Sequence, residues 1–147
     1  MEIEVKTFDE LSNRELYEIL RLRSEVFVVE QECIYQDLDN ADFEGYHLTV
    51  RENGQLKAYL RILPKGVVRD EVSLGRVISA ERRKGYGSIA IQEGIKVAKE
   101  KYNPDKIIVI AQRYAEKFYE INGFKSCSGD IMEDGIVHVR MELAANA

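Results

Sequence analysis

Basic residues and glycines gather at one point of the chain, where residues 82–87 read Arg-Arg-Lys-Gly-Tyr-Gly. An apolar run over 72–79 precedes them, and a segment with helical periodicity follows. Backbone amides at a helix start attract anions, and glycines let the backbone approach a ligand closely. Because the formal net charge of the chain is −5, a local cluster of three positively charged residues needs an explanation. The pattern predicts a turn that binds a pyrophosphate.

Other phosphate-binding turns fit these residues less well. A P-loop would need Ser or Thr after Gly-Lys, and no such sequence closes this segment. Residues 85–90 match the G-x-G-x-x-A spacing of a dinucleotide site, in which the first glycine turns directly out of a strand and an acid about 20 residues later holds the ribose. Here 80–84 separate the strand from Gly85, and Asp105 precedes the next apolar run. Two readings remain: an Arg-x-x-Gly-x-Gly pyrophosphate loop from Arg82, or a solvated basic turn that caps a helix.

Length and composition favour one compact domain. A chain of 147 residues with 45% hydrophobic content suits a single domain over 1–147. No apolar run approaches the ~20 residues of a membrane helix, and residues 1–4 do not resemble a signal peptide. Cys33 and Cys127 suggest neither a disulfide framework nor a metal site, so we expect free thiols, no metal and a cytoplasmic protein. The negative net charge argues against nucleic-acid binding.

Hydrophobic periodicity predicts the elements that position the basic turn. A capping box, Ser12-x-x-Glu15, begins a helix that ends in the upper twenties of the numbering. Ile19, Arg23 and Phe27 recur along it at helical spacing. Further elements are expected as strands over 2–7, 46–51, 56–63, 72–79 and 106–111, helices over 86–101 and 114–122, and two strands flanking 134–135. The β-α-β unit over 72–111 supplies a parallel strand pair, so the class is a mixed α/β sheet.

Two dipeptides predict tight hairpin turns, Asn53-Gly54 and Asp134-Gly135. If alternation holds across the first hairpin, Leu48 and Val50 face the same side of the sheet as Leu56, Leu60 and Ile62. The continuous apolar run over 106–111 is typical of a strand buried on both faces. Gly123 is placed to end the last helix in a left-handed conformation.

The last helix carries a second motif, since residues 115–124 read Ala-Glu-Lys-Phe-Tyr-Glu-Ile-Asn-Gly-Phe. With the Arg-x-x-Gly-x-Gly turn earlier in the chain, it resembles the GNAT superfamily of acetyl-CoA-dependent N-acetyltransferases, whose A-x-x-(L/F)-Y-x-x-x-G-F signature lies on this helix. The chain is similar to the ElaA branch over nearly its whole length. The segments that carry this similarity are 26–31, 35–37, 111–112 and 133–136, with His138 and Met141. Gln112 stands where many members have Asn, and Ile34 replaces a Pro frequent in this branch.

The resemblance implies a fold, a reaction and a cofactor site. The fold is a mostly antiparallel sheet whose one parallel pair splays around acetyl-CoA. The reaction is direct acetyl transfer to a primary amine of a small molecule or peptide, by a monomer or homodimer. The residues implied to bind acetyl-CoA are Val77, Ile78 and Ser79 in the splayed strand, Arg82, Arg83, Lys84, Gly85, Tyr86, Gly87 and Ser88 in the turn, and Gln112 and Tyr119 beyond it.

The resemblance makes Tyr119 the proton donor to the departing thiolate. A phenol with a pKa near 10 stays protonated at neutral pH and can stabilise a nearby thiolate. The alternative is a core tyrosine on an amphipathic helix. For the general base, Glu30 after the first helix and His138 on the last hairpin are candidates, each with a structural alternative, and a relay through water to no single residue stays open.

The acidic segment over 37–44 does not fit a calcium loop. An EF-hand starting at Asp37 would need an oxygen ligand at Ala41, glycine at Asp42 and glutamate at Leu48. We expect a solvated loop, which would favour a cationic amine if it lined the acceptor site.

Two other kinds of function compete with direct transfer. Cys33 and Cys127 lack an activating partner, so acyl-enzyme chemistry is not expected. A non-catalytic CoA-binding sensor or interaction module is the main alternative, but such a protein would not need the phenol of Tyr119. A structural domain without cofactor would leave the cations at 82–84 unexplained.

Overall fold

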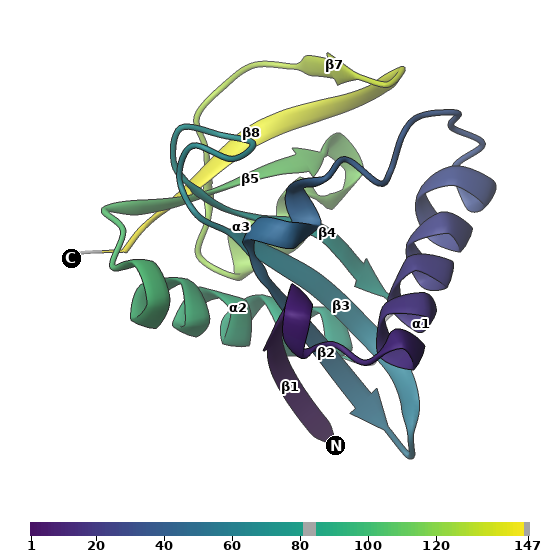
Figure 1. Cartoon of the computed structure of the whole chain (residues 1–147). Helices are drawn as coiled ribbons and strands as arrows, with labels where there is room; N and C mark the ends of the chain where they lie inside the picture. Colours follow the sequence, from purple (N-terminus) through teal and green to yellow (C-terminus); the bar gives the residue numbers. More distant parts are fainter. Residues whose placement is uncertain (81–84, 146–147) are drawn as a thin grey trace.

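The computed structural model describes residues 1–80 and 85–145. Within these residues, eight strands form one sheet in the order β1-β2-β3-β4-β5-β8-β6, and β7 pairs with β8 (Figure 1). The strands are β1 (Glu2–Thr7), β2 (Tyr46–Glu52), β3 (Gln55–Leu63), β4 (Val72–Ser79), β5 (Lys106–Gln112), β6 (Lys125–Ser126), β7 (Ile131–Glu133) and β8 (Ile136–Ala144). The helices are α1 (Asn13–Arg23), α2 (Tyr86–Tyr102) and α3 (Glu116–Ile121), with 3-10 turns η1 (Phe8–Glu10), η3 (Ala41–Glu44) and η4 (Arg113–Ala115) and a π-helical segment η2 (Ser24–Glu30).

The sheet is mixed, as the sequence predicts. β4 and β5 run parallel and are joined by α2, whereas the other paired strands are antiparallel. The predicted mixed α/β class and the parallel pair from the β-α-β unit are therefore confirmed. The short strand β6 was not expected, because two residues carry no periodicity.

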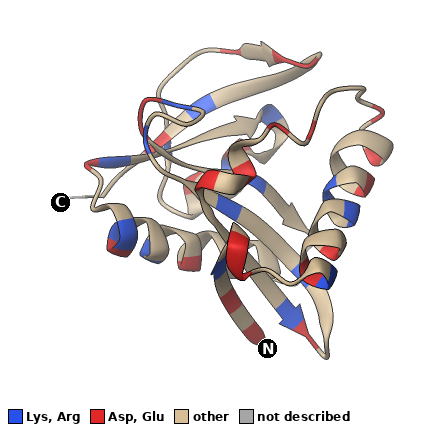
Figure 2. Cartoon of the chain, viewed as in Figure 1, with Lys and Arg blue, Asp and Glu red and all other residues tan. Residues whose placement is uncertain are grey.

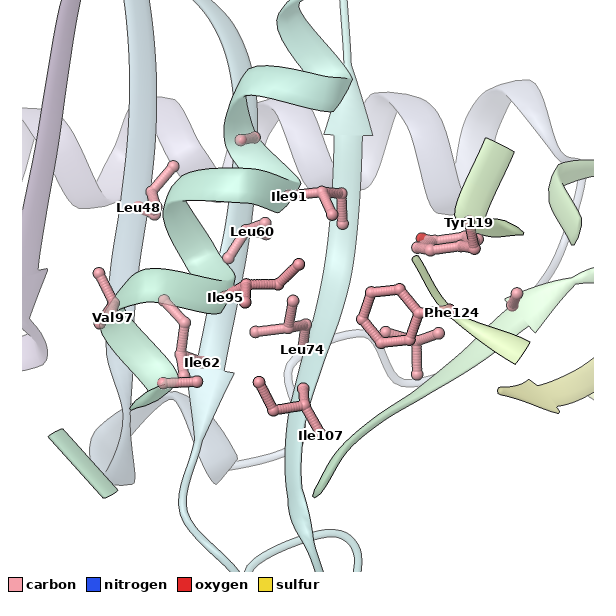
Figure 3. Close-up of a cluster of buried hydrophobic side chains, with 14 of the residues drawn as sticks. Leu48, Leu60, Ile62, Leu74, Ile91, Ile95, Val97, Ile107, Tyr119 and Phe124 are labelled. Carbon is pink, nitrogen blue, oxygen red and sulfur yellow. The ribbon is translucent and has the colours of Figure 1, made fainter. Parts of the chain in front are cut away.

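One face of the sheet packs against α2 through aliphatic side chains. Ile91 and Ile95 of α2 belong to the same buried cluster as Leu60 of β3 and Leu74 of β4, and Tyr119 and Phe124 lie at one end of this cluster (Figure 3). In β5, the consecutive residues 107–109 are all buried, which confirms a strand covered on both faces. This face holds β4, β5 and α2 in fixed positions.

Both predicted hairpin turns are present. Asn53 and Gly54 have φ values of 54° and 76°, and Asp134 and Gly135 have 50° and 77°, the left-handed values that type I′ turns require. The prediction for Leu56 is wrong, however. Val50 pairs with Ala58 while the next residue, Arg51, pairs with Leu56, so β3 carries one extra residue. This bulge reverses the alternation, and Leu56 packs on the opposite face.

Helix α1 begins with the predicted capping box. The Ser12 side chain accepts a hydrogen bond from the Glu15 amide at 3.1 Å, and the Glu15 carboxylate accepts one from the Ser12 amide at 2.8 Å. The helix continues into the π-helical segment η2, which matches the predicted end in the upper twenties. Ile19 of α1 packs against Tyr59 and Ile78 of the sheet, on the face opposite α2.

The face under α1 also holds a set of charges that we call the buried ion network: Arg23, Asp37, Asp39, Asp42, Arg61 and Arg76. Arg23 is 0% exposed, and its guanidinium donates to Asp37 at 3.1 Å and to Asp42 at 2.7 Å. Arg61 donates to Asp39 at 2.8 and 2.7 Å. Figure 2 shows the acidic segment before β2 lying beside the basic positions of the sheet.

The prediction of a solvated acidic loop is therefore wrong for Asp37 and Asp42, whereas Asp39 and Glu44 are exposed. Asp37 and Asp42 are each 7% exposed, and internal arginines neutralise them. Asp39 is also tied to Arg61. Loop carboxylates that form ion pairs inside the protein cannot by themselves favour a cationic acceptor.

In the part of the chain that the structure describes, no helix is both long enough and apolar enough to span a bilayer.

Candidate active site

Strands β4 and β5 separate soon after they meet. They pair only through Val72 with Ile107 and Ser73 with Ile108, and beyond these residues the strands diverge (Figure 1). A cleft of about 1430 Å³ opens here, lined by the later residues of β4, by β5, by the start of α2 and by α3. This volume exceeds that of a typical drug-sized site, so the cleft has room for a long ligand together with a second molecule.

An irregularity in β4 accompanies the separation. Tyr59 pairs with Ile78 whereas Arg61 pairs with Gly75, so β4 has one more residue than β3 over this stretch. Within it, Arg76 has a φ of 52°, which is unusual for a residue with a β-carbon. Bulges bend a strand and commonly occur next to active sites. The bulge lies where β4 loses β5 as a partner.

The start of α2 presents unoccupied amides to the cleft. Gly85 is the N-cap in a left-handed conformation (φ 81°) and has no side chain with which to cap the helix. The first helical bond from the cap runs from the Ile89 amide to the Gly85 carbonyl at 3.1 Å, and the amides of 86–88 have no hydrogen-bond partner among the residues that the structure describes. Together with the helix dipole they form a site suited to an anion.

Gly87 allows a close approach of three elements. A β-carbon at this position would lie 3.3 Å from Phe118 Cζ of α3 and 3.4 Å from Ser79 Cβ of β4. A side chain here would therefore press α2 away from β4 and α3, at the same place where its free amides face the cleft.

Tyr119 reaches the cleft from α3. Its side chain lies edge-on to Phe118 and Phe124, with ring centroids 5.1 and 6.0 Å away, and the residue is 8% exposed. Burial raises the pKa of the Tyr119 phenol well above 10, so the group is protonated at neutral pH. Its hydroxyl has no hydrogen-bond partner among the described residues, which leaves the proton available to a bound ligand.

Asn122 links α3 to the start of α2. Its side chain donates to Ser88 Oγ at 3.4 Å and to the Phe118 carbonyl at 2.9 Å, and it accepts from Gln92 at 3.0 Å. The residue is buried. Asn122 therefore fixes the position of Tyr119 relative to the helix start.

The structure brings most of the predicted cofactor residues to one cleft. Those that line it are Val77, Ile78, Ser79, Gly85, Gly87, Ser88, Gln112 and Tyr119. The half-buried side chain of Tyr86 packs instead against the aliphatic cluster, so Tyr86 contributes to the turn through its backbone only. Arg82, Arg83 and Lys84 lie outside the described residues.

The two candidate bases also line the cleft. Glu30 is exposed at the end of η2. His138 of β8 is half-buried opposite Gln112 of β5, and its Nδ1 lies 2.8 Å from the Ile136 carbonyl. Because a carbonyl only accepts, Nδ1 must carry the proton, and the lone pair of neutral His138 is on Nε2.

Sequence reasoning missed four side chains that also line the cleft: Arg61, Arg76, Tyr35 and Cys33. Arg61 and Arg76 of the buried ion network line the cleft, with the Tyr35 ring 5.7 Å from the Arg76 guanidinium. The Cys33 thiol donates to the Asp134 carbonyl at 3.2 Å and joins two loops 101 residues apart. One signal was visible: Arg23 occupies a position in the apolar stripe of α1, and a charge there indicates a buried partner.

The comparison with known proteins decides the family. The family model described as "Acetyltransferase (GNAT) domain" matches residues 7–145. The chain belongs to this GNAT acetyltransferase family. The splayed parallel pair, the glycine turn at the start of α2 and Tyr119 on α3 therefore lie in the setting of a GNAT acyltransferase.

Relatives named UPF0039 or ElaA match nearly the whole chain. A UPF0039 protein of Schizosaccharomyces pombe is 40% identical over 147 residues, covering 97% of each chain. Protein ElaA of Escherichia coli is 38% identical over 137 residues, covering 90% of this chain and 89% of ElaA. The crystal structure of E. coli ElaA has a TM-score of 0.88 and covers 97% of this chain and 98% of ElaA.

A solved enzyme has the same fold along its full length. The structure of an acyl-CoA N-acyltransferase from Pseudomonas aeruginosa has a TM-score of 0.89 at 34% identity, covering 98% of this chain and 100% of that one. The chain is thus an ElaA-like acyltransferase of the GNAT fold.

Proposed function

We propose that the protein transfers the acetyl group of acetyl-CoA directly to a primary amine. The observation that carries the proposal is the cleft between β4 and β5, which runs from the free amides at the start of α2 to the protonated phenol of Tyr119. A CoA thioester requires an anion site for its pyrophosphate and an acid that can protonate its departing thiolate.

Each part of acetyl-CoA has a proposed partner. The pyrophosphate would bind the amides of 86–88, with charge from the neighbouring cations at 82–84. The pantetheine arm would pair with the backbone of 77–79, and Gln112 on β5 would contact it from the other side. When bound, acetyl-CoA would supply an activated acetyl thioester.

The chain's own residues would then complete the transfer. The amine nitrogen attacks the thioester carbon, and an amide of Val77 or Ile78 stabilises the oxyanion. When the C–S bond breaks, the electron pair goes to sulfur and Tyr119 donates its proton to the thiolate. The amine proton passes to His138 Nε2 or to Glu30, directly or through water.

We further propose that residues 1–147 act as one domain, as a monomer or homodimer, in the cytoplasm. The support for this compartment is that Cys33 and Cys127 are both free thiols.

Cofactor binding is tested by thermal stability. Acetyl-CoA should raise the melting temperature by mass action and NADH should not. Gly87→Asp should abolish the acetyl-CoA shift, because its side chain adds bulk against Phe118 and negative charge beside the pyrophosphate. Gly129→Asp adds the same charge where no atom lies within 4 Å and should keep the shift. Equal shifts with both nucleotides would contradict the pyrophosphate assignment.

Catalysis is tested at Tyr119. Tyr119→Phe removes one hydroxyl but keeps the ring contacts with Phe118 and Phe124. Affinity for acetyl-CoA should change little, and kcat for release of free thiol should fall roughly 10²-fold. An unchanged kcat in folded protein would assign Tyr119 to the core and proton donation to water.

A further inference from the structure

Arg76 has a backbone conformation that its residue type disfavours. Its φ of 52° lies in the left-handed region, where a β-carbon crowds the following carbonyl oxygen. Five other non-glycine residues among those described have a positive φ, and all five lie in turns or at helix ends, whereas Arg76 lies inside strand β4. Such a conformation persists only where the surrounding structure holds it.

The strain lies in the bulge of β4. Arg76 and Val77 together oppose the single residue Leu60 of β3. Where the first residue of a bulge is left-handed it is usually glycine, which adopts this conformation without strain. Glycine would therefore suit the backbone at position 76 better than arginine, so we look to the side chain of Arg76 for what holds the conformation.

This side chain is fixed by an acidic and an aromatic neighbour. Arg76 Nε donates to Asp37 Oδ1 at 2.7 Å, and Arg76 Nη2 donates to the Asp37 carbonyl at 3.0 Å. The guanidinium also lies 5.7 Å from the centroid of the Tyr35 ring. Hydrogen bonds between ionised groups are stronger than neutral ones, and the planar guanidinium binds two acceptors in a fixed geometry. These contacts can offset the strain at the Arg76 backbone.

Asp37 is itself held in place from the opposite side. It is 7% exposed, and its second carboxylate oxygen and its carbonyl oxygen each accept a hydrogen bond from Arg23 at 3.1 Å. The Tyr35 hydroxyl donates to Asp37 Oδ1 at 3.1 Å. Because Arg23 is a fully buried residue of α1, Asp37 fixes the bulge of β4 relative to that helix.

The bulge determines the direction of a backbone donor at the cleft. The peptide unit that follows Arg76 carries the Val77 amide, so the φ and ψ angles of Arg76 orient this amide. Val77 and Ile78 line the cleft, where one of their amides is proposed to stabilise the oxyanion. Such donors act by being aimed in advance at the position of the developing charge. A change at Arg76 from left-handed to extended backbone would turn the Val77 amide away from that position.

We infer that Asp37 is a positioning residue for acyl transfer: through Arg76, it holds the bulge of β4 in the left-handed conformation that aims the Val77 amide at the thioester oxygen. This inference rests on the proposed function in treating the carbonyl oxygen of acetyl-CoA as the group that the amide meets. It gives the buried ion network a role in the reaction besides its role in stability.

The test compares Arg76→Gly with Arg76→Ala. Both variants remove the guanidinium and deprive Asp37 of the same partner, but only alanine has a β-carbon that disfavours a positive φ. Crystal structures of the free variants should therefore show residue 76 left-handed with glycine and extended with alanine. A left-handed residue 76 in Arg76→Ala would overturn the inference, because the conformation would persist without the arginine side chain.

Acetyl-CoA labelled with ¹³C at the thioester carbon gives a second measurement, which needs no acceptor amine. A hydrogen bond to the carbonyl oxygen withdraws electron density from the labelled carbon, so its NMR signal should move downfield when acetyl-CoA binds. This downfield shift should be present in the wild-type protein, largely retained in Arg76→Gly and lost in Arg76→Ala. Equal shifts in the two variants would mean that the side chain contributes to stability only, and would overturn the inference.

Asp37→Asn tests whether Asp37 acts through Arg76. The variant keeps the shape of the side chain but removes its charge, so it should reduce the downfield shift in the wild-type background. In the Arg76→Gly background it should cause no further reduction, and a further reduction would contradict the inference. The comparison at residue 76 decides the inference if Asp37→Asn does not fold.

A matched control uses another left-handed residue. Asn103 has a φ of 45°, ends α2 and is not among the residues that line the cleft. Asn103→Gly and Asn103→Ala should differ in stability but give the same downfield shift. A difference in the shift between them would show that strain at a distant residue moves the signal, and would remove the support that the Arg76 variants provide.

The measurements separate this inference from the proposed function. If residue 76 becomes extended in Arg76→Ala but acetyl-CoA does not bind the wild-type protein, the proposed cofactor is refuted and the hold of Asp37 on the bulge stands. If the wild-type protein releases thiol from acetyl-CoA and the two Arg76 variants give equal downfield shifts, the transferase stands and the positioning role is refuted.

Discussion

The two faces of the sheet bury different side chains: the α2 face is apolar, whereas the α1 face combines a small apolar cluster around Ile19 with the buried ion network. Toward α2, β2 and β3 present Leu48, Leu60 and Ile62, all fully buried and without a polar atom in their side chains. Toward α1, the same two strands present His47 and Arg61, each 2% exposed. Adjacent residues of the same strands thus face hydrocarbon on one side and charge on the other.

The difference follows from what each face must hold. The aliphatic face packs a regular helix, whose periodic side chains fill the space. The α1 face holds the irregular stretch over 31–45, in which the large apolar side chains of Ile34, Leu38 and Phe43 are exposed. His47 bonds the Asp42 carbonyl at 2.9 Å and the Tyr59 hydroxyl at 2.7 Å, and the arginines hold the aspartates. Hydrogen bonds and ion pairs have preferred directions, so they fix the position of this stretch beside the cleft. Apolar contacts have no preferred direction and would fix it less well.

The largest effect is expected when an ion is removed from the α1 face. Arg23→Ala leaves the buried carboxylates of Asp37 and Asp42 with one fewer guanidinium, and we expect a loss of about 3–5 kcal/mol in the free energy of unfolding. Urea denaturation measures the change. Arg21→Ala, two residues earlier with a side chain 68% exposed, is the matched control and should change little. Similar small effects from both variants would mean that the charges under α1 contribute as little as surface charges.

A smaller effect is the pH dependence of stability, which we expect from His47 on the α1 face and not from the α2 face. Burial lowers the pKa of His47, which is surrounded by Asp42, Tyr59, Arg23 and Arg61, so the ring stays neutral in the folded protein. The unfolded chain takes up a proton near pH 6.5 and the folded chain does not. The stabilisation is therefore complete above pH 6.5 and is lost as pH falls toward the lowered folded value.

Chemical denaturation at a series of pH values checks this dependence. His47→Asn should lose the decrease in stability that begins below pH 6.5. Ile91→Ala, on the aliphatic face, should lower stability by the same amount at every pH. A pH profile unchanged by His47→Asn would exclude the histidine as its source.

A second decrease is expected at lower pH from the carboxylates. Burial alone would raise the pKa of Asp39, but hydrogen bonds from Arg61 outweigh it and hold the value at about 2. The contribution of Asp39 is present above about pH 4 and is lost as pH falls toward 2.

The smallest effect concerns an ion pair at the edge of the same face. Arg51 contacts Glu18 at 2.6 and 3.1 Å, but the Glu18 side chain is 44% exposed. Glu18→Gln should cost less than about 1 kcal/mol, because solvent screens such pairs. Urea denaturation against Arg23→Ala gives the comparison. A loss equal to that of Arg23→Ala would show that geometry, and not burial, sets the strength of pairs on this face.

The sequence predicts the aliphatic face well and the charged face poorly. Ile91 and Ile95 recur at helical spacing, and Asn53-Gly54 requires a particular turn, so local rules reach the right structure. From the sequence, Asp37 and Asp42 are interpreted as solvated loop carboxylates, because their ion-pair partners Arg23 and Arg61 are distant in the chain. Leu56 was assigned to the wrong face because alternation does not reveal a bulge.

The candidate site divides in the same way. Gly85, Gly87 and Tyr119 lie in motifs with a fixed local geometry, and the structure places all three at the cleft. Arg61 and Arg76 carry no motif. Only the three-dimensional arrangement brings them to the cleft.

The early separation of β4 and β5 has a consequence for hydrogen exchange. In a strand, alternate residues direct their N–H groups to opposite neighbours. β5 keeps a regular register with β8 as far as Gln112, so from Val109 onward every second amide of β5 faces the gap, while the others face β8. The free protein should therefore exchange fast and slow amides in alternation along this end of β5, whereas the bulge in β4 interrupts such a pattern. A ligand whose backbone-like amides lay in the gap would slow only the fast set, so its binding site could be recognised by a protection pattern with a period of two residues.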